Sequence, residues 1–241
     1  LIASDFAGNE TSTIFYLRRS PTVNAPRVLP FQHHFKAGQA DSLVTAYLKM
    51  NVPQKSLSED LYFQFGSEPV SGDQVFSAQY RLDEDRIALL MPVDLQIRPF
   101  PHPDSIKQKL LIARVNEEGK YQYCASTWDG TWLKSQISRF GKYQVIADIE
   151  APTIKLISHT ASGSSHQFTF EIKDNVMPAG GLRYNATLDN EWILAEYDLK
   201  RDRITCRISA SEWDKTTYTF KLLVEDAVGN STTYDYRLNF K

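Results

Sequence analysis

The stretch LLVEDAVGNST at residues 222–232 aligns without a gap to LIASDFAGNET at residues 1–11. The two copies share leucine, aspartate, glycine, asparagine and threonine at matching places, and Leu17 falls on Leu238 further along. In the shared Asp-x-x-Gly-Asn segment, aspartate can hydrogen-bond the backbone two residues on, glycine supplies a positive φ, and asparagine tolerates the left-handed region. Alternating strand-like residues follow both copies. The repeat therefore predicts the hairpin loop between the last two strands of an immunoglobulin-like β-sandwich.

The places of the two copies predict how the chain divides. The second copy closes a complete domain, whereas the first begins within its penultimate strand. We expect residues 1–20 to be the terminal hairpin of a truncated immunoglobulin-like module, 21–149 a middle β-sandwich domain, and 150–241 an immunoglobulin-like β-sandwich domain. The segment 20–27 reads as a linker, and 148–152 as a second boundary. Because a lone hairpin is marginal in water, we expect the chain to be a fragment of a longer protein.

The composition favours strands throughout. The 241 residues include 13 Phe, 12 Tyr and 4 Trp, and aromatic side chains suit pleated, half-buried surfaces. Short apolar runs recur between turn signals, and 104–109 fits one short helical turn. The fold class that we predict is all-β, with tandem immunoglobulin-like β-sandwich modules. The expected strands are 43–50, 61–65, 74–80, 93–98, 109–115, 119–125, 132–137 and 141–147, then 153–158, 167–173, 182–188, 191–198, 203–208, 217–225 and 232–239.

Charge, hydropathy and cysteine usage exclude several classes of partner. A formal net charge of −2 gives no field that would favour nucleic acid or an anionic membrane. No apolar stretch approaches the ~18 residues needed to span a bilayer, so we expect no membrane insertion. Cys124 and Cys206 lie in expected strands of different halves, which favours two buried free thiols over a disulfide bridge.

Four polar residues are candidate metal ligands. Asp174 and Asn175 lie between two expected strands, and Asp226 and Asn230 lie in the last hairpin loop. Alternate loops of a sandwich gather at one end, and calcium prefers hard oxygen ligands of this kind. The alternative is that these residues only shape their turns.

Two tryptophans are candidates for glycan binding. Trp128 and Trp132 bracket an expected Asp129-Gly130 turn, and exposed aromatic rings stack on sugars. We expect Trp128 at the tip of the turn, whereas Trp132 begins the returning strand and packs. The alternative is that both belong to the core, as most aromatics in sandwiches do.

Several segments resemble one family. ISRFGKYQVIAD at 137–148, the segments 188–198 and 224–230, and PVDLQIRP at 92–99 resemble the accessory β-sandwich region that follows the catalytic domain in lysostaphin-type zinc metallopeptidases of Bacteroides-like bacteria. The resemblance covers most of the chain. It implies a periplasmic, cell-surface or secreted location in a bacterium and a parent protein that cleaves peptidoglycan cross-bridges.

The zinc site that the resemblance implies is not expected in this chain. Such a site needs a His-x-x-x-Asp pair and a later His-x-His. None of the five histidines fits either pattern, and the neighbours His33 and His34 would point to opposite faces of a strand. Gly-x-Ser-x-Gly and phosphate-loop motifs are also missing. We therefore expect no catalytic or cofactor-binding residue here, and zinc only in a peptidase domain outside this chain.

Two functions remain open at this point. The first is a non-catalytic accessory or interaction region of a secreted cell-envelope peptidoglycan metallopeptidase, positioning or tethering an upstream catalytic domain of the same polypeptide. The alternative is a cell-surface adhesin or carbohydrate-binding repeat module. The partners that these functions imply are the upstream domain and peptidoglycan or a cell-surface glycan.

Overall fold

The computed structural model describes residues 2–16, 31–162, 165–209, 211 and 213–240. The chain divides into two compact units, residues 1–30 and 31–241, which are described separately. The expected linker at 20–27, together with Leu1 and Leu17 of the repeat, lies outside the described residues. In the described part, no helix is long and apolar enough to cross a membrane.

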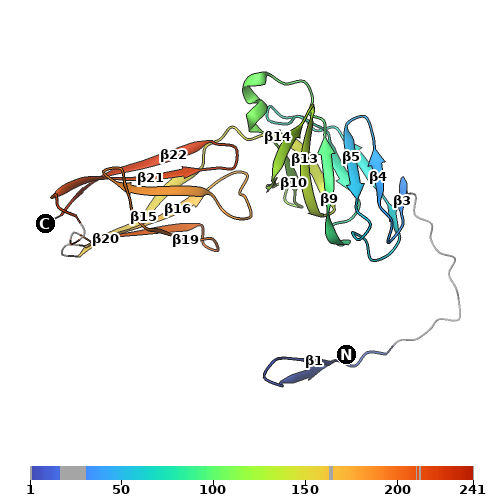
Figure 1. The fold of residues 1–241 in the computed structure, drawn as a ribbon, viewed down its shortest axis with the longest axis horizontal. Helices are drawn as coiled ribbons and strands as arrows, with labels where there is room; N and C mark the ends of the chain where they lie inside the picture. The colour runs from blue at the N-terminus through green and yellow to red at the C-terminus, as the bar shows by residue number, and fades with distance from the viewer. Residues whose placement is uncertain (1, 17–30, 163–164, 210, 212, 241) are drawn as a thin grey trace. The chain divides into compact units, whose positions relative to one another are not determined.

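The first unit contains one antiparallel hairpin, β1 (Ile2–Ser4) and β2 (Glu10–Ser12) (Figure 1). The Asp5 Oδ1 atom accepts hydrogen bonds from the N–H groups of Ala7 and Asn9, both at 2.9 Å. The Asn9 side chain donates to Asp5 Oδ2 at 2.8 Å, and Gly8 has a φ of 82°. Each residue type of the repeat therefore has the role in the loop that its chemistry predicts.

The second copy of the repeat joins β21 (Thr217–Glu225) to β22 (Ser231–Asn239) and has the same hydrogen bonds. Asp226 Oδ1 accepts from the N–H of Val228 at 2.9 Å and of Asn230 at 2.8 Å, and Asn230 Nδ2 donates to Asp226 Oδ2. Gly229 has a φ of 81°. The predicted hairpin loop is confirmed in both copies.

The middle part of the chain is a sandwich of two five-stranded antiparallel sheets around one core (Figure 1). The first sheet has the order β11 (Tyr121–Cys124), β10 (Leu110–Val115), β14 (Gly141–Ala147), β8 (Gln79–Leu82) and β7 (Phe65–Glu68). The second has the order β12 (Ser126–Asp129), β13 (Trp132–Arg139), β9 (Ala88–Ile97), β5 (Leu48–Val52) and β4 (Asp41–Val44). A small pair, β3 (His33–Phe35) and β6 (Leu61–Phe63), and a 3-10 helix, η1 (Asp104–Lys109), complete this part.

The C-terminal part is a sandwich of two four-stranded sheets. One sheet has the order β15 (Thr153–Ser162), β16 (Ser165–Lys173), β20 (Arg203–Ser209) and β19 (Ala195–Asp198), and the other has β18 (Glu191–Trp192), β17 (Arg183–Leu188), β21 and β22. In immunoglobulin lettering these orders are A-B-E-D and C′-C-F-G. The all-β class and the immunoglobulin-like sandwich are therefore present in the structure.

Period-two alternation builds the C-terminal core. Along β21, Tyr218, Phe220, Leu222 and Val224 are buried while their neighbours face outward. Phe220 stacks on Phe168 of the opposite sheet, with ring centroids 4.8 Å apart. Such aromatic packing supplies a large buried area across the sandwich.

A tyrosine fixes the corner that leads into β21. The Tyr218 hydroxyl accepts from the N–H of Lys215 at 2.7 Å and donates to Asp214 Oδ1 at 3.0 Å. A tyrosine near the start of strand F that bonds back to the upstream backbone is a hallmark of immunoglobulin-like domains. These hydrogen bonds attach the segment between β20 and β21 to the core.

Four expected strands are wrong in their extent. In 74–80 only residues 79 and 80 belong to a strand, β8, and 61–65 is divided between β6 and β7 of different sheets. The range 43–50 is a hairpin and not one strand, because the Thr45 hydroxyl holds a turn through the N–H and C=O of Leu48. The range 191–198 is divided between β18 and β19, which belong to different sheets. A continuous apolar pattern does not reveal where a chain crosses from one sheet to the other.

Both cysteines are free, as expected, and lie in different cores. Burial raises the pKa of Cys124 to about 11 and that of Cys206 to about 12. Since the thiolate is the reactive form, neither thiol is activated as a nucleophile.

Two glycines provide a matched test of packing in the C-terminal sandwich. Gly181 and Gly229 have φ values of 80° and 81°, but only at Gly181 would a Cβ meet neighbours, 2.3 Å from Tyr197 and 2.9 Å from Leu199. We expect Gly229→Ala to lower the free energy of unfolding by about 1–2 kcal/mol from backbone strain. Gly181→Ala should lower it by about 2–5 kcal/mol, because a steric clash is added. Urea denaturation measures both, and equal losses would contradict the packing described here.

Candidate functional site

The middle and C-terminal sandwiches meet in an apolar cluster separate from their two main cores. Its buried members come from β10, β14 and the loop after β16, and partly buried residues from β11 and the β21–β22 loop pack against them. The cluster comprises Leu111, Ala113, Ile146 and Val176, with Tyr121, Tyr123 and Val228. We call this cluster, the segment 148–152 and the loops at 174–176 and 226–230 the joint.

Hydrogen bonds to backbone carbonyls reinforce the joint. The Lys109 amine donates to the carbonyl of Val228 at 3.0 Å. Asn230 Nδ2 donates to the carbonyl of Asp148 at 3.0 Å, in addition to its bond with Asp226. The repeated loop thus has a second use in its C-terminal copy, because it also holds the segment that connects the two sandwiches.

Three carboxylates converge at the joint. Asp148 follows β14, Asp174 follows β16, and Asp226 follows β21. One carboxylate oxygen of each lies within 4.8 Å of those of the other two. Asp148 and Asp226 are each only 1% exposed, and Asp174 is partly buried. Like charges this close in a buried place are unfavourable unless something compensates them.

The hydrogen bonds leave three of these oxygens without partners. Both Asp226 oxygens are used by its own loop, and Asp174 Oδ2 accepts from the N–H of Val176 at 3.2 Å. Asp174 Oδ1 and both oxygens of Asp148 are buried and accept no hydrogen bond. A buried polar atom without a partner costs about 1–3 kcal/mol, and more when it is charged.

The pKa values reflect this crowding. Burial, followed by the charges of Asp174 and Asp226, raises the pKa of Asp148 to about 7. The nearby Asn175 side chain and Glu150 N–H oppose the shift, although neither makes a hydrogen bond of normal geometry to Asp148. The pKa of Asp174 is also raised, mainly by burial, against the effect of the Val176 N–H.

The nearby cationic groups do not neutralise the three carboxylates. Lys109 bonds to a carbonyl, and Arg183 pairs with Glu225 and donates to the carbonyl of Asp226 at 3.2 Å. Among the described residues, no lysine or arginine forms an ion pair with Asp148, Asp174 or Asp226. The joint therefore concentrates negative charge on oxygen atoms, which are the donors that hard cations prefer.

The predicted metal ligands have separate outcomes in the structure. It brings Asp174 and Asp226 together, as their places in two loops at one end of a sandwich indicate. Asn230 acts as a hydrogen-bond donor to Asp226 and Asp148, and Asn175 is exposed beside the cluster. Sequence reasoning missed Asp148, which it placed in a boundary segment. Its position directly after the buried strand β14 was the available signal.

The predicted glycan-binding tryptophans are not free surface rings. Trp132 is 8% exposed and lies beneath Lys49 and Arg98, whose charged groups are 4.3 and 4.4 Å from its ring centroid. Trp128 is partly buried, packs near His102, and donates its indole N–H to a backbone carbonyl at 3.3 Å. The packing expected for Trp132 is confirmed, whereas Trp128 is not the exposed tip residue that the turn indicated.

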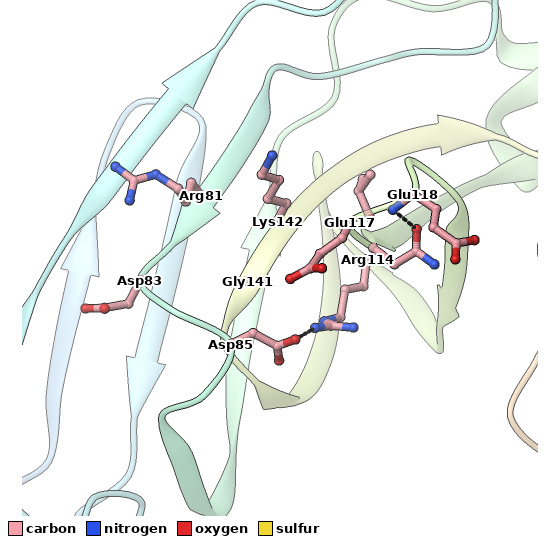
Figure 2. A pocket seen from close by; sticks show the side chains of 10 residues that line it. Arg81, Asp83, Asp85, Arg114, Glu117, Glu118, Gly141 and Lys142 are labelled. Atoms are coloured by element: carbon pink, nitrogen blue, oxygen red, sulfur yellow. Dashed lines mark hydrogen bonds and ion pairs between the residues drawn. The ribbon is translucent and has the colours of Figure 1, made fainter.

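A cleft of about 410 Å³ lies on the middle sandwich (Figure 2). Figure 2 shows Arg114 joined to Asp85, an ion pair of 2.5 Å, with Glu117 beside them. Arg114 also donates to Gln122 at 2.9 Å and lies against Gly141, where a Cβ would be 3.4 Å from its Nε atom. The two terminal nitrogens of Arg114 have partners in Asp85 and Gln122, its buried Nε has none, and acidic residues line the same cleft. We therefore interpret this cleft as a structural ion-pair network.

The raised pKa of Asp148 predicts a pH-dependent loss of stability in buffer containing a chelator. Since the folded-state pKa lies above the ordinary value, stability falls as the pH rises from about 4 to 7. Asp148→Asn removes this charge. It should leave the free energy of unfolding nearly unchanged near pH 4 and raise it by about 1–2 kcal/mol at pH 8. Urea titrations of both proteins at the two pH values measure the difference, and a gain that is equal at both would contradict it.

The two copies of the repeat supply a second comparison. Asn9 and Asn230 make the same bonds within their loops, but only Asn230 also bonds to Asp148 in the described structure. We expect Asn230→Ala to speed amide hydrogen exchange in the segment 148–152, because that segment loses an anchor. Asn9→Ala is the matched control and should leave this exchange unchanged. Equal exchange in all three proteins would show that the bond does not hold the joint.

Comparison with protein families gives a match for the middle sandwich. Residues 32–148 match the Zu5-like domain family, which is a little under half of the chain. No curated protein matches. The middle sandwich is thus similar to a Zu5-like domain, and the match ends at Asp148, the residue that contributes its carboxylate to the joint.

Proposed function

We propose that this chain is a non-catalytic accessory region of a secreted cell-envelope peptidoglycan metallopeptidase, positioning or tethering an upstream catalytic domain. The observation that carries the proposal is the joint, which unites two sandwiches in one compact unit, residues 31–241. The resemblance of 137–148 to peptidase accessory regions supplies the proposed parent protein.

The construction of the joint supports a positioning role. Domains within one chain move relative to each other unless their interface is well packed and apolar. Here four buried apolar residues and side-chain bonds from Lys109 and Asn230 fix the contact. A spacer built in this way holds what is attached to it at a defined distance and angle.

A tethering role needs an exposed surface, and Trp192 offers one. It is 68% exposed on the short edge strand β18, and the neighbouring Leu194 is 60% exposed. The other three tryptophans, all within the described part of the chain, are buried or partly buried. An amphipathic ring on an open edge is suited to stack on a sugar of a wall polymer or a surface glycan. The same feature supports the alternative, a cell-surface adhesin or carbohydrate-binding module.

Cosedimentation with purified peptidoglycan sacculi tests the tethering role. We expect the chain to pellet with sacculi, and Trp192→Ala to lower the bound fraction several-fold, because stacking on one aromatic ring contributes about 1 kcal/mol or more. Tyr62→Ala is a matched control, since Tyr62 is a 58% exposed aromatic residue of the middle sandwich.

The outcomes separate the two functions. A chain that stays in the supernatant contradicts tethering to the wall. Binding to cell-surface glycans without binding to sacculi favours the adhesin. A loss of binding in Tyr62→Ala and not in Trp192→Ala would place the contact on the other sandwich.

A further inference from the structure

We infer that Asp148, Asp174 and Asp226 form a calcium site that locks the joint between the two sandwiches. The inference goes beyond the proposed function, because it concerns the joint and not the polymer or glycan that the chain binds. It depends on the oxygen atoms described above and on the places in the chain from which they come.

The first support is Asp148 itself. Asp148 is only 1% exposed, neither of its carboxylate oxygens accepts a hydrogen bond, and one of them lies within 4.8 Å of oxygens of the other two carboxylates. Asp174 adds a third buried oxygen without a partner. A buried carboxylate is retained in a protein when it is paired or coordinates a metal, and no basic side chain among the described residues pairs with this one.

The geometry and the donor chemistry favour calcium. Oxygens that are each 2.3–2.6 Å from one ion are at most about 5 Å apart, so carboxylates within 4.8 Å need little movement to share it. Zinc prefers nitrogen and sulfur donors, and no histidine or cysteine belongs to this group. Magnesium requires near-ideal octahedral geometry, whereas calcium accepts the irregular ligand sets that loops provide.

The N-terminal hairpin is an internal control for the simpler explanation that these residues only shape turns. Asp5 has the same loop bonds as Asp226, so the turn needs no further carboxylate. In the described structure, Asp5 belongs to no such group of acids, and the Asn9 side chain lowers its pKa. Turn formation explains why the loop contains Asp226. It does not explain why the oxygens of Asp148 and Asp174 are buried without hydrogen-bond partners.

The chain segments that contribute the three carboxylates indicate what calcium binding would do. Asp148 comes from the connecting segment, and Asp174 and Asp226 come from two loops of the C-terminal sandwich. One ion would tie all three segments together and remove the mutual repulsion of their charges. Extracellular modules bind calcium with dissociation constants of about 10⁻⁴–10⁻³ M, so a site of this kind would fill as calcium reaches millimolar concentrations.

Calorimetric titration of the chelator-treated chain with calcium chloride tests the inference. We expect one site with a Kd of about 10⁻³ M or tighter, a higher melting temperature, and slower amide exchange at 148–152 when calcium is bound. Asp148→Asn and Asp174→Asn keep the side-chain size and should each weaken binding at least about tenfold, because a charged ligand is lost. Asp5→Asn is the matched control and should bind as the wild type does.

The opposite results overturn the inference. These are no heat and no change in melting temperature at several millimolar calcium, unchanged affinity in Asp148→Asn and Asp174→Asn, loss of binding in Asp5→Asn, or magnesium binding as tight as calcium. Circular dichroism of each variant checks that it folds, and if one does not, the other is decisive. Sacculus binding measured in chelator separates the two proposals, since tethering through Trp192 does not require the ion.

Discussion

The carboxylate of Asp226 is the interaction on which the rest of the C-terminal half depends. It accepts two backbone N–H groups and one side-chain amide of its own loop, and so fixes the connection between β21 and β22. The shape of this loop presents Asn230 to the connecting segment and the carbonyl of Val228 to Lys109. This loop therefore fixes the last hairpin of the C-terminal sandwich and binds the segment that connects the two sandwiches. It also places the negative charge of Asp226 at the joint.

Much of the fold was predictable from local chemistry. The Asp-x-x-Gly-Asn repeat specified its hairpin because each residue acts within five positions of the others. Alternation also located β21, whose buried residues recur at every second place. The divided strands at 43–50 and 191–198 were not predictable, because the hydroxyl that turns one chain and the sheet exchange of the other depend on partners distant in sequence.

The site was predictable only in part, for the same reason. Two loops at one end of a sandwich suggested that Asp174 and Asp226 approach each other, but the third carboxylate comes from the connecting segment. Asp148 is buried because the second sandwich covers it, and a single sequence carries no direct signal of that contact. Trp128 shows the reverse, since a turn residue expected to be exposed is covered by neighbours from η1 and from the loop that precedes it.

The loop of the repeat has one more consequence, which concerns the entropy of assembly. The Asp5 copy keeps its full set of internal bonds in a hairpin whose strands are wholly exposed. In both copies the bonds of the loop join residues within five positions, so the loop loses its conformational freedom when its own hairpin folds and not when it meets a partner. In the C-terminal copy, the bonds of Asn230 to Asp148 and of Val228 to Lys109 therefore form with little further loss of conformational entropy.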